Sequence, residues 1–283
     1  MTSSATPGTP PPGHVLAAFG ARETPTPKEG GRGLAWRAGR IVLKPVDTNE
    51  ERLAWQRDVL GEIRTEGFRV SRPERSIAGA LVVDGWSAST FCVGRHEPRR
   101  WTDVIAVGRL LHRALKDVPR PAFLSSRTDP WSMAERAAWG DAPLAPYREA
   151  PHVARLVASL VPVDAPSQLI HGDLTGNVLF ADPLPAAIID LSPYWRPVEF
   201  ASAIVVADAL VWEGADVSEV ESAFSIESFG QLFARALLFR IISDAIVDPV
   251  AALARAEAYA PAVDLATRLI DAERLSPGRN RVV

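Results

Sequence analysis

Hydrophobic and polar positions near the start of the chain follow the pattern of two β-hairpins. Residues 34–44 read LAWRAGRIVLK, in which an apolar pair and an apolar triplet flank a turn at Ala38-Gly39. Residues 77–93 repeat the pattern around the turn dipeptide Asp84-Gly85. Short apolar runs joined by such turns are typical of paired antiparallel strands. The sequence therefore predicts two hairpins, the first of which closes on a buried strand.

The segment between these hairpins has helical spacing instead. In residues 48–64, acidic side chains crowd the first turn and apolar side chains recur on one side. Thr48 or Asn49 can cap the first turn with its side-chain oxygen. Residues 14–93 are therefore expected to form a mostly antiparallel sheet with one helix.

Helical periodicity dominates the rest of the chain. Apolar positions recur at helical spacing in seven segments: 104–115, 153–160, 199–212, 218–225, 228–246, 249–258 and 262–274. A β-rich stretch, residues 168–189, interrupts them. The predicted fold class is α+β, with a small lobe of sheet and helix, a hinge near 91–95 and a larger, mainly helical lobe.

The expected domain boundaries follow from the same pattern. Residues 1–13 carry four prolines and almost no apolar side chains, which predicts a disordered arm. We expect residues 14–93 to form the first lobe and residues 94–283 the second.

Composition and charge narrow the classes of partner. The chain has 34 acidic and 31 basic side chains, a net charge of −3, and 47% apolar residues. This balance is typical of a soluble globular protein and argues against nucleic acid or an anionic membrane as the main partner. Cys92 is the single cysteine, so neither an intrachain disulfide nor a cysteine-based zinc cluster can form.

The sequence carries no pattern typical of a membrane or export signal. The most apolar stretch, Phe200 to Trp212, is shorter than the roughly 18–20 residues that cross a bilayer, and Asp208 interrupts it. No basic head precedes an apolar run near residue 1. We expect a bacterial-type cytoplasmic enzyme or binding protein that acts on a small molecule.

Polar residues able to carry chemistry gather in residues 168–192, QLIHGDLTGNVLFADPLPAAIIDLS. His171, Asp173 and Asn177 precede one short apolar strand, and Asp190 follows the next. Because a hairpin folds back on itself, Asp190 should return near Asn177 and Asp173. Oxygen ligands held together in this way suit Mg²⁺ beside substrate phosphates. A further carboxylate among them can accept a proton from an attacking hydroxyl.

This order of residues resembles the aminoglycoside phosphotransferase and choline kinase group, small-molecule kinases with a two-lobed, protein-kinase-like fold. The matching residues are His171-Gly172-Asp173-Leu174, then Asn177, then Ile189-Asp190. The resemblance extends over most of the chain. It implies Asp173 as the catalytic base, Asn177 and Asp190 as ligands of Mg²⁺, and His171 as a structural member of the loop. It also implies ATP, or another nucleoside triphosphate, as the cosubstrate.

The resemblance further implies a lysine at the end of a strand, where it binds nucleotide phosphates together with a helical glutamate. Lys44 ends the apolar triplet of the first hairpin. The following helix offers Glu50, Glu51 and Glu62. Glu51 is the preferred partner because it lies early in the helix; a solvated glutamate is the alternative.

Two further nucleotide-binding features are implied in the first lobe. A glycine-rich turn would cover phosphates with its backbone N–H groups, and Gly30, Gly31 and Gly33 precede the strand that bears the lysine. Backbone groups of Phe91 and Cys92 would face the adenine at the hinge.

The sequence departs from the pattern of the group in three places. Three residues separate Asp173 from Asn177, where the group has four. A bulky segment, Leu191 to Trp195, follows the second aspartate. The acidic residue that buttresses the loop from the next helix is not obvious, and Glu199 is the best stand-in.

These observations lead to two hypotheses about function. The first is a phosphotransferase that moves the γ-phosphate of ATP, with Mg²⁺, to a hydroxyl of an unidentified small molecule. The second is a catalytically impaired relative that binds nucleotide or another ligand and acts through a partner, which the shortened loop favours. The segment 121–147 mixes acids, arginines and aromatic residues, which is not typical of a pocket for polycations.

Overall fold

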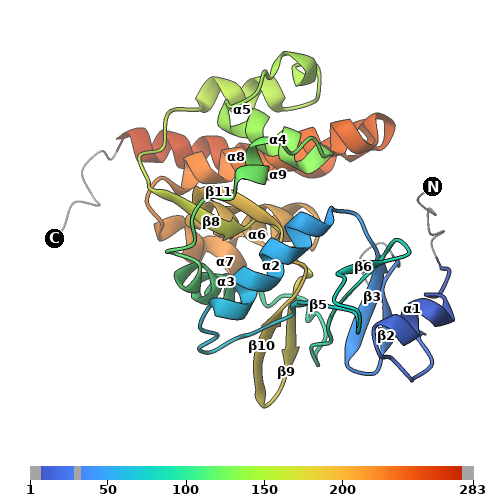
Figure 1. Cartoon of the computed structure of the whole chain (residues 1–283). Coiled ribbons are helices and arrows are strands. Elements are labelled where there is room, and N and C mark those ends of the chain that lie inside the picture. The colour runs from blue at the N-terminus through green and yellow to red at the C-terminus, as the bar shows by residue number, and fades with distance from the viewer. Residues whose placement is uncertain (1–7, 29–32, 276–283) are drawn as a thin grey trace. The chain divides into compact units, whose positions relative to one another are not determined.

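The computed structural model describes residues 8–28 and 33–275 (Figure 1). Contact density divides the chain into two compact units. The first comprises Met1–Glu97, Arg113–Val118 and Gly176–Leu191; the second comprises Pro98–His112, Pro119–Thr175 and Ser192–Val283. Residues 1–7 of the expected disordered arm lie outside the described residues.

The elements of the first unit are α1 (Gly13–Ala18), β1 (Thr26–Pro27), β2 (Trp36–Ala38), β3 (Ile41–Pro45), α2 (Glu50–Glu62), β4 (Arg69–Val70), β5 (Pro73–Glu74), β6 (Val82–Val83), β7 (Trp86–Thr90), β9 (Val178–Ala181) and β10 (Leu184–Ile188). The second unit contains most of α3 (Trp101–Ala114), then η1 (Ala122–Ser125), α4 (Pro130–Trp139), η2 (Ala145–Tyr147), α5 (Val153–Ser159), β8 (Ser167–His171), β11 (Pro193–Pro197), α6 (Glu199–Val211), α7 (Val217–Val220), η3 (Glu221–Ser225), α8 (Phe229–Val247) and α9 (Pro249–Leu275). The predicted α+β class is confirmed.

Both predicted hairpins form part of one antiparallel sheet in the first unit. Its strands run in the order β1-β2-β3-β7-β5, and β6 pairs with β7. Ala38 pairs with Ile41 across the first turn, and Val83 pairs with Trp86 across the second. The predicted helix begins at Glu50 and is capped by Asn49, whose side chain accepts the Arg52 N–H at 2.9 Å.

The two faces of this sheet differ in character. Ile41 and Leu43 of β3 are buried against α1, which contributes Val15 to the same apolar cluster. Val42 and Lys44 alternate with them along the strand and therefore lie on the other face. The strand thus places Lys44 on the face opposite α1.

A second, three-stranded sheet, which includes the β9–β10 hairpin, completes the first unit. β10 pairs antiparallel with β9 and parallel with β4. Residues 176–191 therefore group with the first unit, although they lie beyond the expected boundary at residue 93. The Arg95–Phe180 bridge adds a further tie between this hairpin and the hinge segment.

The second unit is built around two predominantly apolar helices that are buried on all sides over most of their length. Phe200 to Ala209 of α6 are all buried, and α8 is buried from Phe229 to Phe239. A helix that is hydrophobic all round is stable only when other elements surround it; α8 packs against α4, α6 and α9. In the described ranges, no helix combines the length and apolarity needed to cross a membrane.

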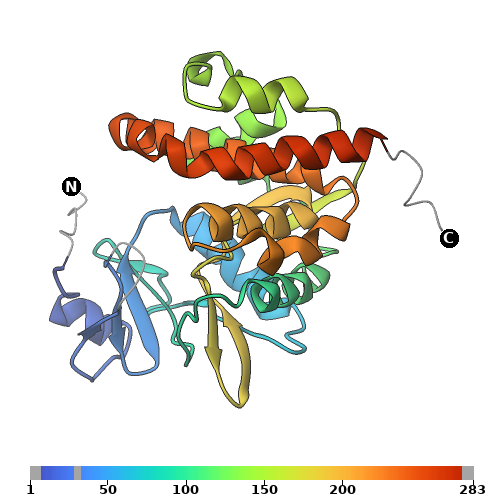
Figure 2. The ribbon, with the colours of Figure 1, turned by 180° about the vertical axis from the view of Figure 1, so that it is seen from behind.

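The last helix corrects one sequence expectation. The predicted helices 249–258 and 262–274 form one helix, α9, with Pro261 inside it (Figure 2). The proline removes one backbone hydrogen bond, but α9 packs along α8 and buries Tyr259 and Val263 on either side of the proline. Tertiary packing therefore carries the helix through a residue that usually ends one.

Replacing Pro261 with alanine should stabilise the protein. Pro261 is exposed, so alanine removes no buried contact and restores a helical N–H donor. We expect the free energy of unfolding to rise by about 1–3 kcal/mol in a urea titration. Pro249→Ala is the matched control, because Pro249 occupies the first helical position, where proline is tolerated. Equal effects of the two substitutions would contradict a continuous α9.

Candidate active site

The β9–β10 hairpin brings Asn177 and Asp190 together at its open end. Val178 pairs with Ile188, and the Ile189 N–H donates to the Asn177 carbonyl at 3.0 Å. Asp190 has a φ of +48°, in the left-handed region that aspartate tolerates better than most side chains. Asp190 thus lies one residue beyond the position that faces Asn177 across the open end of the hairpin.

Lys44 lies beside this hairpin. Its Nζ donates to Oδ1 of Asp190 at 2.6 Å, and both side chains are partly exposed. Burial acts to lower the pKa of the Lys44 ammonium, but the carboxylates of Asp190 and then Asp47 outweigh it and raise that pKa. The first unit therefore places a cation and a carboxylate in direct contact on the face of β3 opposite α1.

Glu51, the expected partner of Lys44, is not brought to it. Glu51 is exposed on α2, whereas the described partner of Lys44 is Asp190. Another side chain of α2, Gln56, contacts the residue that follows Asp190: its Nε2 donates to the Leu191 carbonyl at 2.8 Å. Five residues turn a helix by about 140°, so Gln56 and Glu51 point in different directions.

The other nucleotide-binding candidates lie on the segments around the sheet. Gly30 and Gly31 lie outside the described residues, whereas Gly33 has a φ of +66° with open space around it. The Phe91 N–H donates to the Arg40 carbonyl at 2.8 Å, so this donor is used within the sheet. Cys92 is buried, and burial raises the pKa of its thiol, as expected for a packing residue.

In the second unit, His171 ties together the backbone around Asp173. The imidazole is fully buried at the end of β8. Its Nδ1 accepts the Asp173 N–H at 3.2 Å and the Ser192 N–H at 3.3 Å. Asp173 itself is 43% exposed at its side chain. This geometry agrees with the structural role that the resemblance implies for His171.

His112 supports the same loop from α3. Its Nε2 accepts the His171 N–H at 3.0 Å. Burial, together with the nearby His171, lowers the pKa of His112 to about 3, so the ring is neutral near neutral pH. His112 does not stand out in the sequence, because a lone histidine on an apolar helix face carries no specific signal.

Tyr194 explains the bulky segment that follows Asp190 in the sequence. A side chain on Gly172 would meet Cδ2 of the Tyr194 ring at 2.4 Å, so only glycine allows this approach. The ring is buried and makes an edge contact with Phe239. Tyr194, in strand β11, therefore packs directly against the loop that bears Asp173.

A buried arginine links Asp173 to the helical core. Arg240 on α8 donates to both carboxylate oxygens of Asp208 on α6, at 2.7 and 2.6 Å. Its Nη2 also donates to Oδ1 of Asp173 at 3.0 Å. Burial alone would lower the pKa of Arg240, but Asp208 and then Asp173 raise it. Arg240 is therefore a charged bridge between the core and the loop.

Glu199, the expected buttress of the loop, has a different role. Its carboxylate accepts hydrogen bonds from Arg109 at 3.0 Å and from the Ser202 hydroxyl at 2.8 Å. The buttress is Asp208, which acts through Arg240 and lies nine positions further along α6. Its sequence signal is the single acid that interrupts the apolar stretch 200–212.

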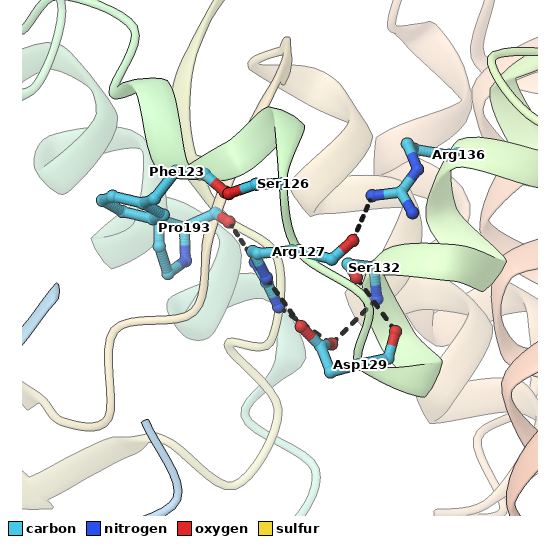
Figure 3. Close-up of polar contacts among 7 residues, drawn as sticks. All are labelled: Phe123, Ser126, Arg127, Asp129, Ser132, Arg136 and Pro193. Atoms are coloured by element: carbon cyan, nitrogen blue, oxygen red, sulfur yellow. Dashed lines mark hydrogen bonds and ion pairs between the residues drawn. The ribbon is translucent and has the colours of Figure 1, made fainter. Parts of the chain in front are cut away.

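Acids of the segment 121–147 are engaged by arginines. Arg127 binds both oxygens of Asp129, at 2.8 and 3.1 Å, and also donates to the Pro193 carbonyl at 2.8 Å (Figure 3). Asp129 in turn caps α4 by accepting the Ser132 N–H. Arg136 donates to the Arg127 carbonyl. This network fixes α4, which the sequence analysis does not predict, to strand β11.

Arg196 on β11 engages the remaining two acids of this segment. It forms ion pairs with Glu135 and, at 2.6 Å, with Asp141. Its guanidinium also lies 4.8 Å from the centre of the Trp139 ring. The segment therefore presents no acidic side chain that lacks an arginine partner.

Asn177 and Asp190 are the pair suited to hold a divalent cation. In residues 8–28 and 33–275, no three or more His, Cys, Asp or Glu side chains form a metal-binding group. A carboxylate and an amide oxygen are hard donors, and Mg²⁺ commonly takes one or two protein ligands together with phosphate oxygens and water. The donor set fits Mg²⁺ bound with a nucleotide.

A protein-family model identifies the family to which the chain belongs. The model of the phosphotransferase enzyme family matches residues 34–194, more than half of the 283 residues. The chain belongs to this family. The matched range includes Lys44, the loop with Asp173, and the β9–β10 hairpin. The resemblance inferred from the sequence is thereby confirmed.

Solved structures share the fold of this family member. An aminoglycoside phosphotransferase from Alicyclobacillus acidocaldarius is 15% identical, with a TM-score of 0.62 over 98% of this chain and 99% of that one. An AMP complex of a spectinomycin phosphotransferase is 14% identical, with a TM-score of 0.56 over 92% and 96%. A choline kinase from Streptococcus pneumoniae is 11% identical, with a TM-score of 0.54 over 92% and 97%.

A search of curated protein sequences finds no match. The structural likenesses, all at low identity, establish the fold of the chain.

Removing the cation of the buried bridge should destabilise the protein strongly. Arg240→Met leaves the buried carboxylate of Asp208 without its cation. We expect a loss of about 3–5 kcal/mol in the free energy of unfolding, measured by urea titration. The control Arg155→Met breaks an ion pair with Asp264 in which both side chains are about half exposed, and should cost less than about 1 kcal/mol. A similar small loss in both variants would show that Arg240 is not a structural bridge.

His112 should make stability depend on pH in a defined window. Its folded-state pKa of about 3 lies below the ordinary value of 6.5, so between these values the unfolded chain binds the extra proton. Stability is then lost as pH falls from 6.5, by about 1.4 kcal/mol per unit. His112→Gln keeps an acceptor and removes the titration.

Urea midpoints of the wild type and His112→Gln at pH 6.5 and 4.5 test this expectation. The wild type should lose about 2–3 kcal/mol more than the variant over this interval. Parallel loss in wild type and His112→Gln would contradict a neutral, buried His112.

Proposed function

We propose that this phosphotransferase family member transfers the γ-phosphate of ATP, or of another nucleoside triphosphate, to a hydroxyl of a small molecule, with Mg²⁺. The observation that carries the proposal is the 2.6 Å contact between Lys44 and Asp190, beside Asn177. This contact joins Lys44, the proposed phosphate-binding cation, to Asp190, one of the two residues suited to bind Mg²⁺. When no nucleotide is bound, the two side chains neutralise each other.

In the proposed mechanism, Lys44 binds phosphate oxygens of the nucleotide. Asp190 and Asn177 would hold Mg²⁺, which would neutralise charge on the phosphates when bound. Asp173 accepts the proton of the acceptor hydroxyl as the new oxygen–phosphorus bond forms. The bond between the γ-phosphorus and the leaving nucleoside diphosphate breaks in the same transfer.

The buried contacts below Asp173 suit a catalytic base. Arg240 holds one oxygen of its carboxylate, and His171 accepts its backbone N–H. Phosphoryl transfer depends on positioning, and an error near 1 Å can cost about a hundredfold in rate. A side chain held at both backbone and carboxylate needs little reorganisation when the acceptor binds.

The acceptor should lack a cluster of ammonium groups. All three acids of the segment 121–147 are paired with Arg127 or Arg196. Capture of a polycation would have to break these pairs. We therefore favour a neutral or weakly charged alcohol, and localisation in the cytoplasm, where nucleoside triphosphates are available.

A second candidate function is a binding protein without turnover. Three residues separate Asp173 from Asn177, one fewer than the resemblance to small-molecule kinases implies. Gly176, with a φ of +76° and open space around it, closes the shortened loop. This closure favours the enzyme, because the shorter loop is accommodated by a residue that pays little strain for a positive φ.

Calorimetric titration with ATP, with and without Mg²⁺, tests the proposal. We expect Mg²⁺ to strengthen nucleotide binding to the wild type, and Asp190→Ala to lose this effect. Asp173→Ala should keep nucleotide binding but reduce phosphate transfer to any accepted alcohol by about 10²–10⁴-fold.

Asp58→Ala is the matched control, an exposed acid on α2 of the same unit. It should bind Mg-nucleotide like the wild type. Unchanged binding by Asp190→Ala would contradict the metal assignment, and turnover by Asp173→Ala at the wild-type rate would remove Asp173 from the role of base. Nucleotide binding without transfer to any screened alcohol would favour the second candidate.

A further inference from the structure

An arginine on β2 lies over the aromatic ring of the residue that follows β7. The guanidinium carbon of Arg37 lies 3.9 Å from the centre of the Phe91 ring. Its Nε donates to the Gly39 carbonyl at 3.0 Å. Among residues 8–28 and 33–275, no side chain or backbone group pairs with its two terminal amino groups. Arg37 therefore presents a fixed, planar pair of donors.

Strand pairing places Arg37 on the face of the sheet that carries Lys44. Arg37 pairs directly with Val42, and Val42 precedes Lys44 by two residues on the same strand. Residues paired across strands, or two apart along one, share a face. Leu43 lies on the other face, buried with α1. The Arg37–Phe91 stack and Lys44 thus face the same side.

The spacing of these groups matches the length of a bound nucleotide. Phe91 is hydrogen-bonded to Arg40, which lies in the turn just before β3 and four residues before Lys44. At about 3.3 Å per residue this is about 13 Å, comparable to the extent of a nucleoside triphosphate from base to γ-phosphate. With its phosphates at Lys44, a nucleotide lying along this face brings its base to the stack.

We propose that Arg37 binds the nucleobase and makes the site selective for guanine. The inference rests on the proposed function, since it assumes that phosphates bind at Lys44. Guanine presents two adjacent acceptors, O6 and N7, which match the donor pair of a guanidinium. Adenine presents N7 beside an amino group, so one Arg37 donor would face another donor.

The contact with the Phe91 ring holds the Arg37 guanidinium in place before a nucleobase binds. A cation over an aromatic face is stabilised by the ring quadrupole and keeps its edge available for hydrogen bonds. The Nε–Gly39 bond fixes the remaining rotation. Fewer rotamers are then lost when a base binds, so more of the hydrogen-bond energy contributes to affinity.

Equilibrium binding of Mg-GTP and Mg-ATP to the full chain tests the inference. The wild type should bind Mg-GTP at least about tenfold more tightly, the range expected of one matched bidentate contact. Arg37→Gln should remove this ratio. Arg37→Lys keeps the charge without the planar donor pair, and should also remove it.

Arg40→Gln is the matched control. Arg40 is exposed in the same hairpin and carries the same charge, so its loss should lower both affinities equally or leave them unchanged. Equal affinity of the wild type for the two nucleotides, a preference for Mg-ATP, or a guanine preference that survives in Arg37→Gln would overturn the inference while leaving the proposed function intact. Binding of neither nucleotide would overturn the proposed function and the inference with it.

Discussion

A buried ion pair between Arg240 and Asp208 is the constraint on which the second unit depends. Two core helices, α8 and α6, each contribute one charge, and the arginine has one further donor that reaches Asp173. A buried carboxylate without a partner is costly, so α6 and α8 must meet in the register that pairs them. The same register positions the carboxylate proposed as the base, which couples folding of the core to the geometry of the loop.

Several contacts restrict the backbone of the loop that bears Asp173. His171 accepts two backbone N–H groups, His112 accepts the N–H of His171, and Tyr194 packs on Gly172. His112 and Tyr194 are uncharged near neutral pH. Buried polar groups that are hydrogen-bonded to one another rigidify their surroundings. We infer that the site invests stability in positioning, which is what phosphoryl transfer requires.

Local sequence patterns predicted the sheet, the capped helix and the β9–β10 hairpin, because strand alternation and turn residues act over a few positions. The pairing of Lys44 was not predictable in this way: Glu51 is near in sequence, whereas Asp190 arrives through a hairpin 146 residues away. Helix α4 was missed although Asp129, Pro130 and Gly140 mark its ends, and the break expected at Pro261 was overridden by packing on α8. Long-range packing decided each of these cases.

The most direct test of the central claim is a crystal structure with Mg²⁺ and a non-hydrolysable nucleoside triphosphate analogue. The account predicts Mg²⁺ within about 2.0–2.1 Å of oxygens of Asp190 and Asn177. Lys44 should then contact phosphate, and Arg240 should still bind Asp173. A nucleotide bound with its metal away from Asp190, or with no phosphate near Lys44, would contradict the account.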